Sequence, residues 1–206
     1  MRIVFVSSAR FVEDMDKSFY KHTLGCALLF VGIFTFAQKK YDKKTSAEEI
    51  SLEEKALSGY KTAFDFSRED VRKGWWKYAR AFGSPLNMKS YYKVTIPSET
   101  TDGNVDLEIY TQTIAREGGG TEFFLGLEND TYKEQALTMI LDFKKKLYIN
   151  ELVEEISQNQ KTANDLSNQY LDELLDDKRK ELLDSIAKIE VEINLLMQEI
   201  KVIEGS

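Results

Sequence analysis

The stretch YKTAFDFSREDVRKGWWKYARAFGSP, residues 60–85, changes its hydrophobic period once along its length. The first seven residues alternate, so that every second side chain falls on one face: Tyr60, Thr62, Phe64 and Phe66. This period of two predicts a half-buried β-strand. Ser67 then precedes the acidic residues Glu69 and Asp70, a pattern that is typical of a capped helix start.

The second part of this stretch has the period of an α-helix. One helical face holds the apolar side chains Val71, Trp75, Tyr78, Ala79 and Phe82. Trp75 is therefore predicted to lie in the core. Trp76 is turned away by about 100°, so it either packs over a sheet edge or a neighbouring helix, or serves as a binding aromatic. Gly83 and Pro85 are expected to end the helix.

Three further strands and a second helix are expected downstream. Alternating apolar residues, divided by glycine-containing turns at Asp102-Gly103 and Gly118–Gly120, predict strands at 92–96, 105–113 and 123–127. Asn129-Asp130 is a typical cap for the next helix, which has an apolar face: Tyr132, Ala136, Met139, Ile140, Phe143 and Leu147. The order β-α-β-β-β-α predicts a two-layer α+β domain at 59–148, with an antiparallel sheet and helices on one face.

Residues 149–206 are rich in charge and lack Gly, Pro and Trp before Gly205. Apolar residues step by three and four, as a coiled-coil seam requires: Ile186, Ile189, Ile193, Leu196, Ile200 and Ile203. A weaker heptad precedes them: Ile149, Leu152, Ile156, Ala163, Leu166 and Tyr170. The two registers do not match, so a break is expected between Tyr170 and Leu182. The tail is either a long coiled coil or a helical hairpin, and 157–168 is its most turn-like stretch.

The N-terminal region has the composition of a leader. Residues 15–37 combine basic residues, an uncharged apolar run and the small residues Thr35 and Ala37 at positions −3 and −1, which predicts a signal peptide cleaved after Ala37. The alternatives are an uncleaved anchor and a core helix. Residues 1–14 are interpreted as a mis-assigned start. Residues 38–58 are expected to form a flexible charged segment, with a short helix at Ala47–Leu57.

Cleavage would leave 169 residues with a net charge of −8, against −7 for the whole chain. This acidity argues against nucleic-acid binding. The only histidine, His22, and the only cysteine, Cys26, belong to the leader. Catalysis by Ser-His-Asp or Cys-His, zinc sites built on His or Cys, and disulfides are therefore excluded in the cleaved chain. We expect no cofactor, no metal and no stable membrane span after cleavage.

Carboxylates are the main candidates for chemistry. Asp106 and Glu108 are two residues apart on one strand, and Glu122 is expected on a neighbouring strand. Paired carboxylates can hydrolyse glycosidic bonds. The competing interpretation is the solvated face of a sheet, with Lys93 and Arg116 as charge partners.

Three segments carry a resemblance: WWKYARAFGSP (75–85), YYKVTIPSETTDGNVDLEIY (91–110) and FFLGL (123–127). Together with the leader and the helical tail, they resemble a group of uncharacterised exported proteins of Gram-negative bacteria. The resemblance implies an envelope location, periplasmic or secreted, and no catalytic residue.

We therefore expect a non-enzymatic envelope protein that forms a homo-oligomer or binds a helical partner through its tail. The expected interaction residues are Ile186, Ile189, Ile193, Leu196, Ile200, Ile203 and Trp76. One alternative is a small-molecule carrier, with an apolar cavity lined by Phe64, Tyr92, Leu107 and Phe143. The other alternative is a carboxylate-dependent hydrolase.

Overall fold

The computed structural model describes residues 40–97 and 106–206. The predicted leader at 1–37, with its cleavage point, and the turn at Asp102-Gly103 lie outside the described residues. Every described element belongs to one compact unit, Lys39–Ser206.

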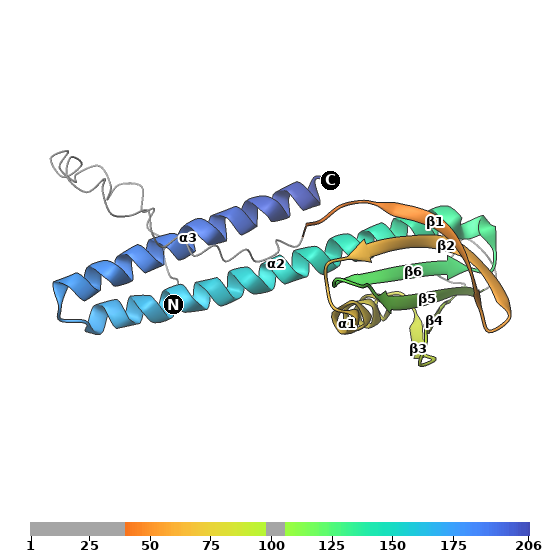
Figure 1. The fold of residues 1–206 in the computed structure, drawn as a ribbon, viewed down its shortest axis with the longest axis horizontal. Coiled ribbons are helices and arrows are strands. Elements are labelled where there is room, and N and C mark those ends of the chain that lie inside the picture. Colours follow the sequence, from red (N-terminus) through yellow and green to blue (C-terminus); the bar gives the residue numbers. More distant parts are fainter. Residues whose placement is uncertain (1–39, 98–105) are drawn as a thin grey trace. The chain divides into compact units, whose positions relative to one another are not determined.

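A six-stranded antiparallel sheet forms one layer of this unit (Figure 1). Its strands lie in the order β1 (Thr45–Leu52), β2 (Lys55–Phe64), β6 (Thr121–Leu127), β5 (Leu107–Ala115), β4 (Tyr92–Ile96) and β3 (Ser84–Asn87). In the central register, Phe123 of β6 lies between Thr62 of β2 and Thr113 of β5. The α+β class and the antiparallel sheet agree with the prediction.

Helices α1 (Arg68–Ala79) and α2 (Lys133–Asp172) cover one face of the sheet, and α3 (Asp176–Glu204) follows α2. Ser67 caps α1 as predicted, whereas Asn129 caps a short 3-10 turn in front of α2, and the N-cap of α2 itself, Tyr132, makes no side-chain cap bond. The Asp70 backbone N–H donates to Ser67 Oγ at 3.1 Å. The Thr131 backbone N–H donates to Asn129 Oδ1 at 2.9 Å, at the short 3-10 turn η3 (Asp130–Tyr132) that leads into α2.

Aromatic rings fill the space between the sheet and the two helices. Trp75 of α1 is 0% exposed, as predicted. Its ring centroid lies 5.2 Å from those of both Phe123 and Phe143. The Phe64 and Phe143 centroids are 5.4 Å apart. Such pairs stabilise a fold by about 0.5–1.5 kcal/mol each beyond their burial, so this cluster anchors both helices to the sheet.

The expectation of a flexible segment at 38–58, with a helix at 47–57, is wrong. This region forms β1 and the start of β2, joined by a tight turn at Glu53 and Glu54, both of which have positive φ. Ile50 and Leu52 pack against a small apolar cluster on the second face of the sheet: Leu57, Tyr91, Tyr110 and Phe124. Local charge suggested disorder, but strand pairing and this cluster hold the segment.

Strand β3 was not expected either, because Pro85 was taken only as the stop signal of the preceding helix. Helix α1 ends at Ala79, and the Gly83 N–H donates to the Ala79 carbonyl at 2.9 Å. Pro85 then lies in an edge strand, where it needs no partner for the missing N–H.

The C-terminal tail is a helical hairpin. Helix α2 continues without a break across residues 148 and 149 and through 157–168, so the predicted domain boundary falls inside a helix and the most turn-like stretch of the tail is helical. The chain reverses at 173–175, inside the interval where the mismatch of registers predicted a break. Helix α2 continues past the end of the sheet, and α3 returns alongside its outer part (Figure 1).

Candidate interaction sites on the helical hairpin and helix α1

The two predicted heptads face each other within one chain. On α3, Ile203 is buried, and the other seam residues are half-buried: Ile186, Ile189, Ile193, Leu196 and Ile200. On α2, the partners are Ile149, Leu152, Ile156, Ala163, Leu166 and Tyr170, all half-buried or buried. Leu196, Ile200 and Ile203 also belong to the main hydrophobic core. The seam is therefore closed by α2 of the same molecule.

The outer face of α3 carries a second row of apolar side chains. Val191 and Leu195 are each 60% exposed and Val202 is 72% exposed. They are spaced by four and seven residues, so they lie on one side of the helix. The heptad pattern did not identify this row, because it marked only the seam.

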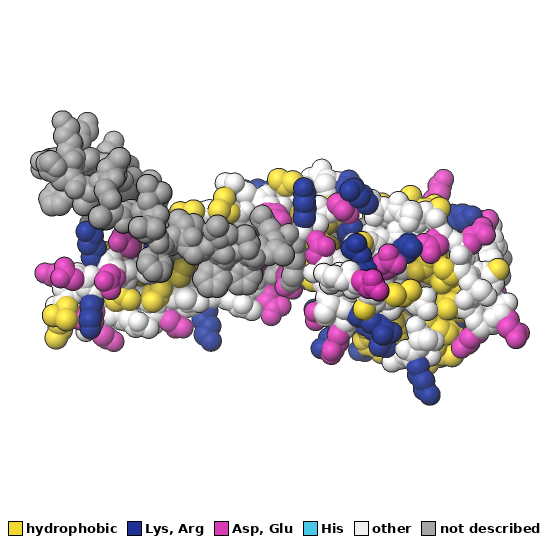
Figure 2. All heavy atoms as spheres, in the orientation of Figure 1, with side chains coloured by type: hydrophobic (Ala, Val, Ile, Leu, Met, Phe, Trp, Pro, Cys, Tyr) yellow, Lys and Arg dark blue, Asp and Glu magenta, His cyan; other side chains and the backbone are white. Residues whose placement is uncertain are grey.

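The hairpin tip, defined here as residues 171–177 (LDELLDD), is both apolar and acidic. Leu174 is 93% exposed, and Leu171 and Leu175 are also exposed. Glu173 Oε1 accepts the backbone N–H groups of Leu174 and Leu175, each at 3.0 Å. These bonds lower the pKa of Glu173 and fix the turn. Acidic, basic and hydrophobic side chains lie together at this end of the hairpin in Figure 2. In the sequence, the basic residues 178–180 follow the two aspartates that begin α3.

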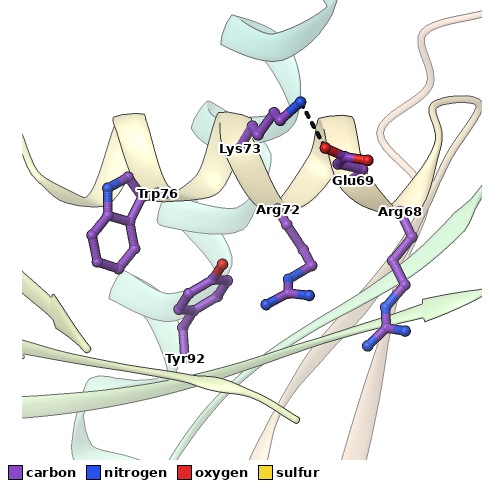
Figure 3. A pocket seen from close by; sticks show the side chains of 6 residues that line it. All are labelled: Arg68, Glu69, Arg72, Lys73, Trp76 and Tyr92. Carbon is purple, nitrogen blue, oxygen red and sulfur yellow. Dashed lines mark ion pairs between the residues drawn. The ribbon is translucent and has the colours of Figure 1, made fainter. Parts of the chain in front are cut away.

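Trp76 lines an open groove of about 530 Å³ over α1, which we call the α1 groove. Its lining residues are Arg68, Glu69, Arg72, Lys73, Trp76 and Tyr92 (Figure 3). The Trp76 and Tyr92 ring centroids are 5.6 Å apart. The Arg72 guanidinium carbon lies 5.2 Å from the Tyr92 ring centroid, in cation–π contact. The floor of the groove is therefore aromatic, with a cation beside it.

The charged residues of the α1 groove differ in whether they form ion pairs. Lys73 pairs with Glu69 at 2.8 Å along the exposed side of α1. Within the described part of the chain, no carboxylate forms an ion pair with Arg68 or Arg72. Figure 3 shows both guanidinium groups pointing away from the Lys73–Glu69 pair. These two groups are free to bind carboxylate or another anionic group.

Two of the three predicted carboxylates, Glu108 and Glu122, form ion pairs on the sheet, whereas Asp106 is exposed and lies just before β5. Glu108 accepts from Lys93 Nζ at 2.5 Å and from the Tyr110 hydroxyl at 2.7 Å. These bonds lower the pKa of Glu108. Glu122 pairs with Lys61 at 3.7 Å rather than with Arg116. A lowered pKa is the opposite of what a general acid needs.

The four residues expected to line a cavity are not grouped around one pocket. Phe64 and Phe143 are in direct contact in the core, and Leu107 packs at its margin. Of these residues, only Tyr92 lines the α1 groove.

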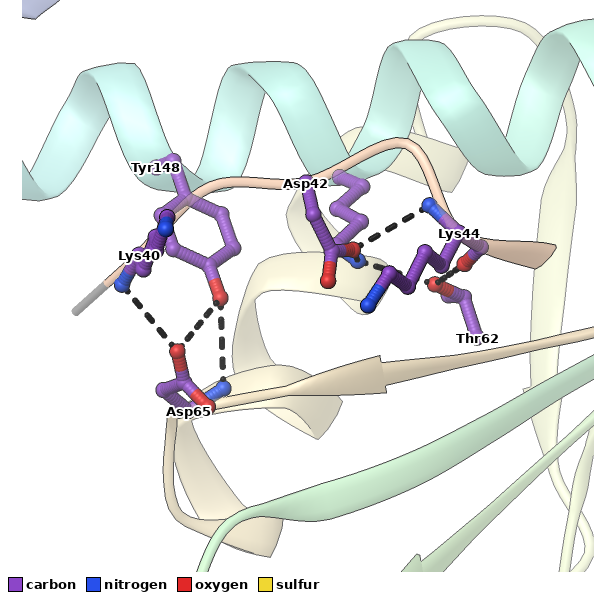
Figure 4. A network of polar contacts seen from close by, with 7 residues as sticks. Lys40, Asp42, Lys44, Thr62, Asp65 and Tyr148 are labelled. Carbon is purple, nitrogen blue, oxygen red and sulfur yellow. Dashed lines mark hydrogen bonds and ion pairs between the residues drawn. The ribbon is translucent and has the colours of Figure 1, made fainter.

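A buried lysine, which the sequence pattern did not indicate, holds the N-terminal end of the unit against α2. Lys144 is 1% exposed, and its Nζ lies 2.5 Å from Asp42 Oδ1 and 3.0 Å from Thr62 Oγ1. Burial opposes ionisation of Asp42, but the hydrogen bond and charge of Lys144 outweigh it and lower the pKa of that carboxyl. Tyr148 and Asp65 form a second contact beside it, and the Lys40 backbone N–H donates to Asp65 (Figure 4).

Within residues 40–97 and 106–206, no helix has the length and apolar character needed to cross a bilayer. The same residues contain no cluster of three or more His, Cys, Asp or Glu side chains that could hold a metal ion.

Comparison with known proteins gives no match: no family model, no curated protein and no solved structure matches this chain. A proposed function therefore has to be argued from the exposed side chains of this chain.

Proposed function

We propose that this chain is a non-enzymatic protein of the Gram-negative envelope, which binds another protein chain through its α2–α3 hairpin. The observation that carries the proposal is the outer row on α3. After α2 has covered the seam, Val191, Leu195 and Val202 remain more than half exposed. Single exposed apolar residues are ordinary, but a row at helical spacing is typical of a surface that packs against another element.

Export is supported by the fit between the predicted leader and the folded unit. The compact unit begins at Lys39, so cleavage after Ala37 would leave it whole. We expect N-terminal sequencing of the protein, expressed from its full sequence in a Gram-negative host, to start at Gln38. A start inside the folded unit, or an intact leader, would contradict the signal-peptide proposal.

A non-enzymatic role is supported by the state of the carboxylates. Glu108 is held by Lys93 and Tyr110 with a lowered pKa. This arrangement favours a charged, structurally engaged side chain over a proton donor.

The test of the proposed binding role is site-specific photo-crosslinking in cells. A photoreactive residue would be placed at Leu195 on the outer row, and a matched one at Gln135, which is exposed on α2 beside the sheet. We expect protein adducts at Leu195 to exceed those at Gln135 several-fold, and to fall when Val191→Ser and Val202→Ser are added. Equal adduct yields at the two positions would contradict the binding role of the hairpin.

A further inference from the structure

The hairpin tip offers carboxylates and leucines that are not used within the chain. Residues 171–177 contain four acidic residues and no cation, and the basic residues 178–180 follow them directly along α3. Glu173 is occupied by the backbone of the turn. Among the described residues, Asp172, Asp176 and Asp177 form no ion pair. Leu174, at 93% exposure, stands between them.

The α1 groove offers the complementary chemistry. Arg68 and Arg72 lie one helical turn apart without an ion-pair partner in the described chain, and guanidinium groups bind carboxylates through two parallel hydrogen bonds. Trp76 and Tyr92 form an apolar floor beside them. A volume of about 530 Å³ is within the range of pockets that accept a bound group.

The two surfaces cannot meet within one chain. Figure 1 shows the turn between α2 and α3 at the end of the hairpin that points away from the sheet, whereas α1 packs on the sheet. The opposite charges and the paired apolar surfaces therefore fit a contact between two copies. We propose that the hairpin tip of one copy docks in the α1 groove of a second copy, with Asp176 or Asp177 on Arg68 and Arg72, and Leu174 against Trp76.

This inference rests on the proposed function, because it takes the hairpin to be a protein-binding element. It adds a second binding surface, the tip, and names the chain itself as the partner of that tip; the outer row on α3 is not part of this contact. The contact joins two different surfaces, so each bound copy still has one free tip and one free groove. A contact of this kind leads to open chains or closed rings rather than to a simple two-fold dimer. Because it depends on opposite charges at an exposed site, it weakens as salt is raised.

The experiment is light scattering on the protein at low and high concentration, with two variants that each remove one side of the contact. The groove variant is Arg68→Glu/Arg72→Glu, and the tip variant is Leu174→Ser/Asp176→Arg/Asp177→Arg. The matched control, Lys77→Glu/Arg80→Glu, makes the same charge change on exposed residues of α1 and its C-cap that do not line the groove. Circular dichroism checks that all variants are folded.

We expect the mass of the unaltered protein and of the control to at least double between the two concentrations. Each variant alone should keep the single-chain mass. An equimolar mixture of the two variants should form a two-chain species and grow no further, because one intact groove and one intact tip remain.

The inference is overturned if the unaltered protein keeps the single-chain mass at both concentrations, or if the mixture forms no two-chain species. It is also overturned if the groove variant associates like the unaltered protein. In that last case, a tip variant that no longer associates would show that the hairpin binds elsewhere, which leaves the proposed binding role standing. The binding role itself is refuted only by the crosslinking result.

Discussion

Lys144 and Asp42 form one ion pair, but we expect the loss of Asp42 to lower the stability of the fold more than the loss of Lys144. Lys144 is 1% exposed, whereas Asp42 is 43% exposed. Removing Asp42 leaves a buried ammonium group with Thr62 as its remaining hydrogen-bond partner. Removing the charge of Lys144 leaves a carboxylate that water can reach. The buried cation should therefore be the costly one to leave behind.

The magnitudes follow from this difference in burial. Breaking a fully buried pair by removing one partner costs about 3–5 kcal/mol. Because Asp42 lies partly in water, we expect Asp42→Ala to reduce the free energy of unfolding by about 2–3 kcal/mol. Lys144→Met keeps most of the aliphatic volume and removes the charge, so we expect a cost of about 1 kcal/mol or less. The double variant should resemble Lys144→Met.

The assay is urea unfolding followed by circular dichroism and tryptophan fluorescence, with linear extrapolation to water. The four proteins form a double-mutant cycle, in which the coupling between the two sites is measured directly. A Lys144→Met variant that loses more stability than Asp42→Ala would refute the reasoning. The charge of Lys144 would then stabilise the fold, instead of being a buried charge that Asp42 has to compensate.

The pH dependence has a defined sign. Since the pKa of Asp42 is lowered in the folded protein, its contribution to stability is present above the ordinary value of 3.8 and is lost as pH falls through the folded-state pKa. The stability difference between the unaltered protein and Asp42→Ala should therefore shrink below about pH 4. A difference that stays constant to lower pH, while both proteins remain folded, would count against the ion pair.

The remaining predictions concern single side chains, and urea unfolding measures each of them. Trp75→Ala should cost about 3–5 kcal/mol because its ring fills the core, while Trp76→Ala should cost about 1 kcal/mol or less; equal costs would refute this placement of the two rings. Gly59→Ala should destabilise strongly, because its Cβ would lie 2.0 Å from the Leu125 carbonyl oxygen; a neutral result would exclude that close approach. Ser67→Ala should cost about 1 kcal/mol by removing the cap of α1, and restoration by Ser67→Asp would identify capping as the cause.

Local periodicity was a reliable guide wherever one face of an element is buried. The alternation at 60–66 and the helical spacing after Ser67 predicted β2 and α1, because each element has a single core-facing side. The same reasoning placed Trp75 in the core. Trp76 is half-buried and packs at the margin of the core. Its contact with Tyr92 depends on the position of β4, which the local pattern does not give.

The two edge strands, β1 and β3, were not predicted from the sequence. The segment 45–52 reads as TSAEEISL, with little hydrophobic alternation. It is held as β1 by pairing with β2, and by a Lys61–Glu48 contact of 2.7 Å between the two strands. These interactions come from residues of β2, outside the segment itself. The pattern of residues 45–52 alone therefore could not predict the strand.

The sequence by itself determined the α+β class, the positions of the buried strands and helices, and the two heptads with their mismatched registers. These features depend on side-chain spacing along the chain, which needs no knowledge of distant contacts. Only the tertiary structure decided that the tail turns back at 173–175 rather than continuing. In a single chain, a long helix would leave both apolar seams in water, whereas the hairpin covers them with each other and buries Ile203 against the domain core.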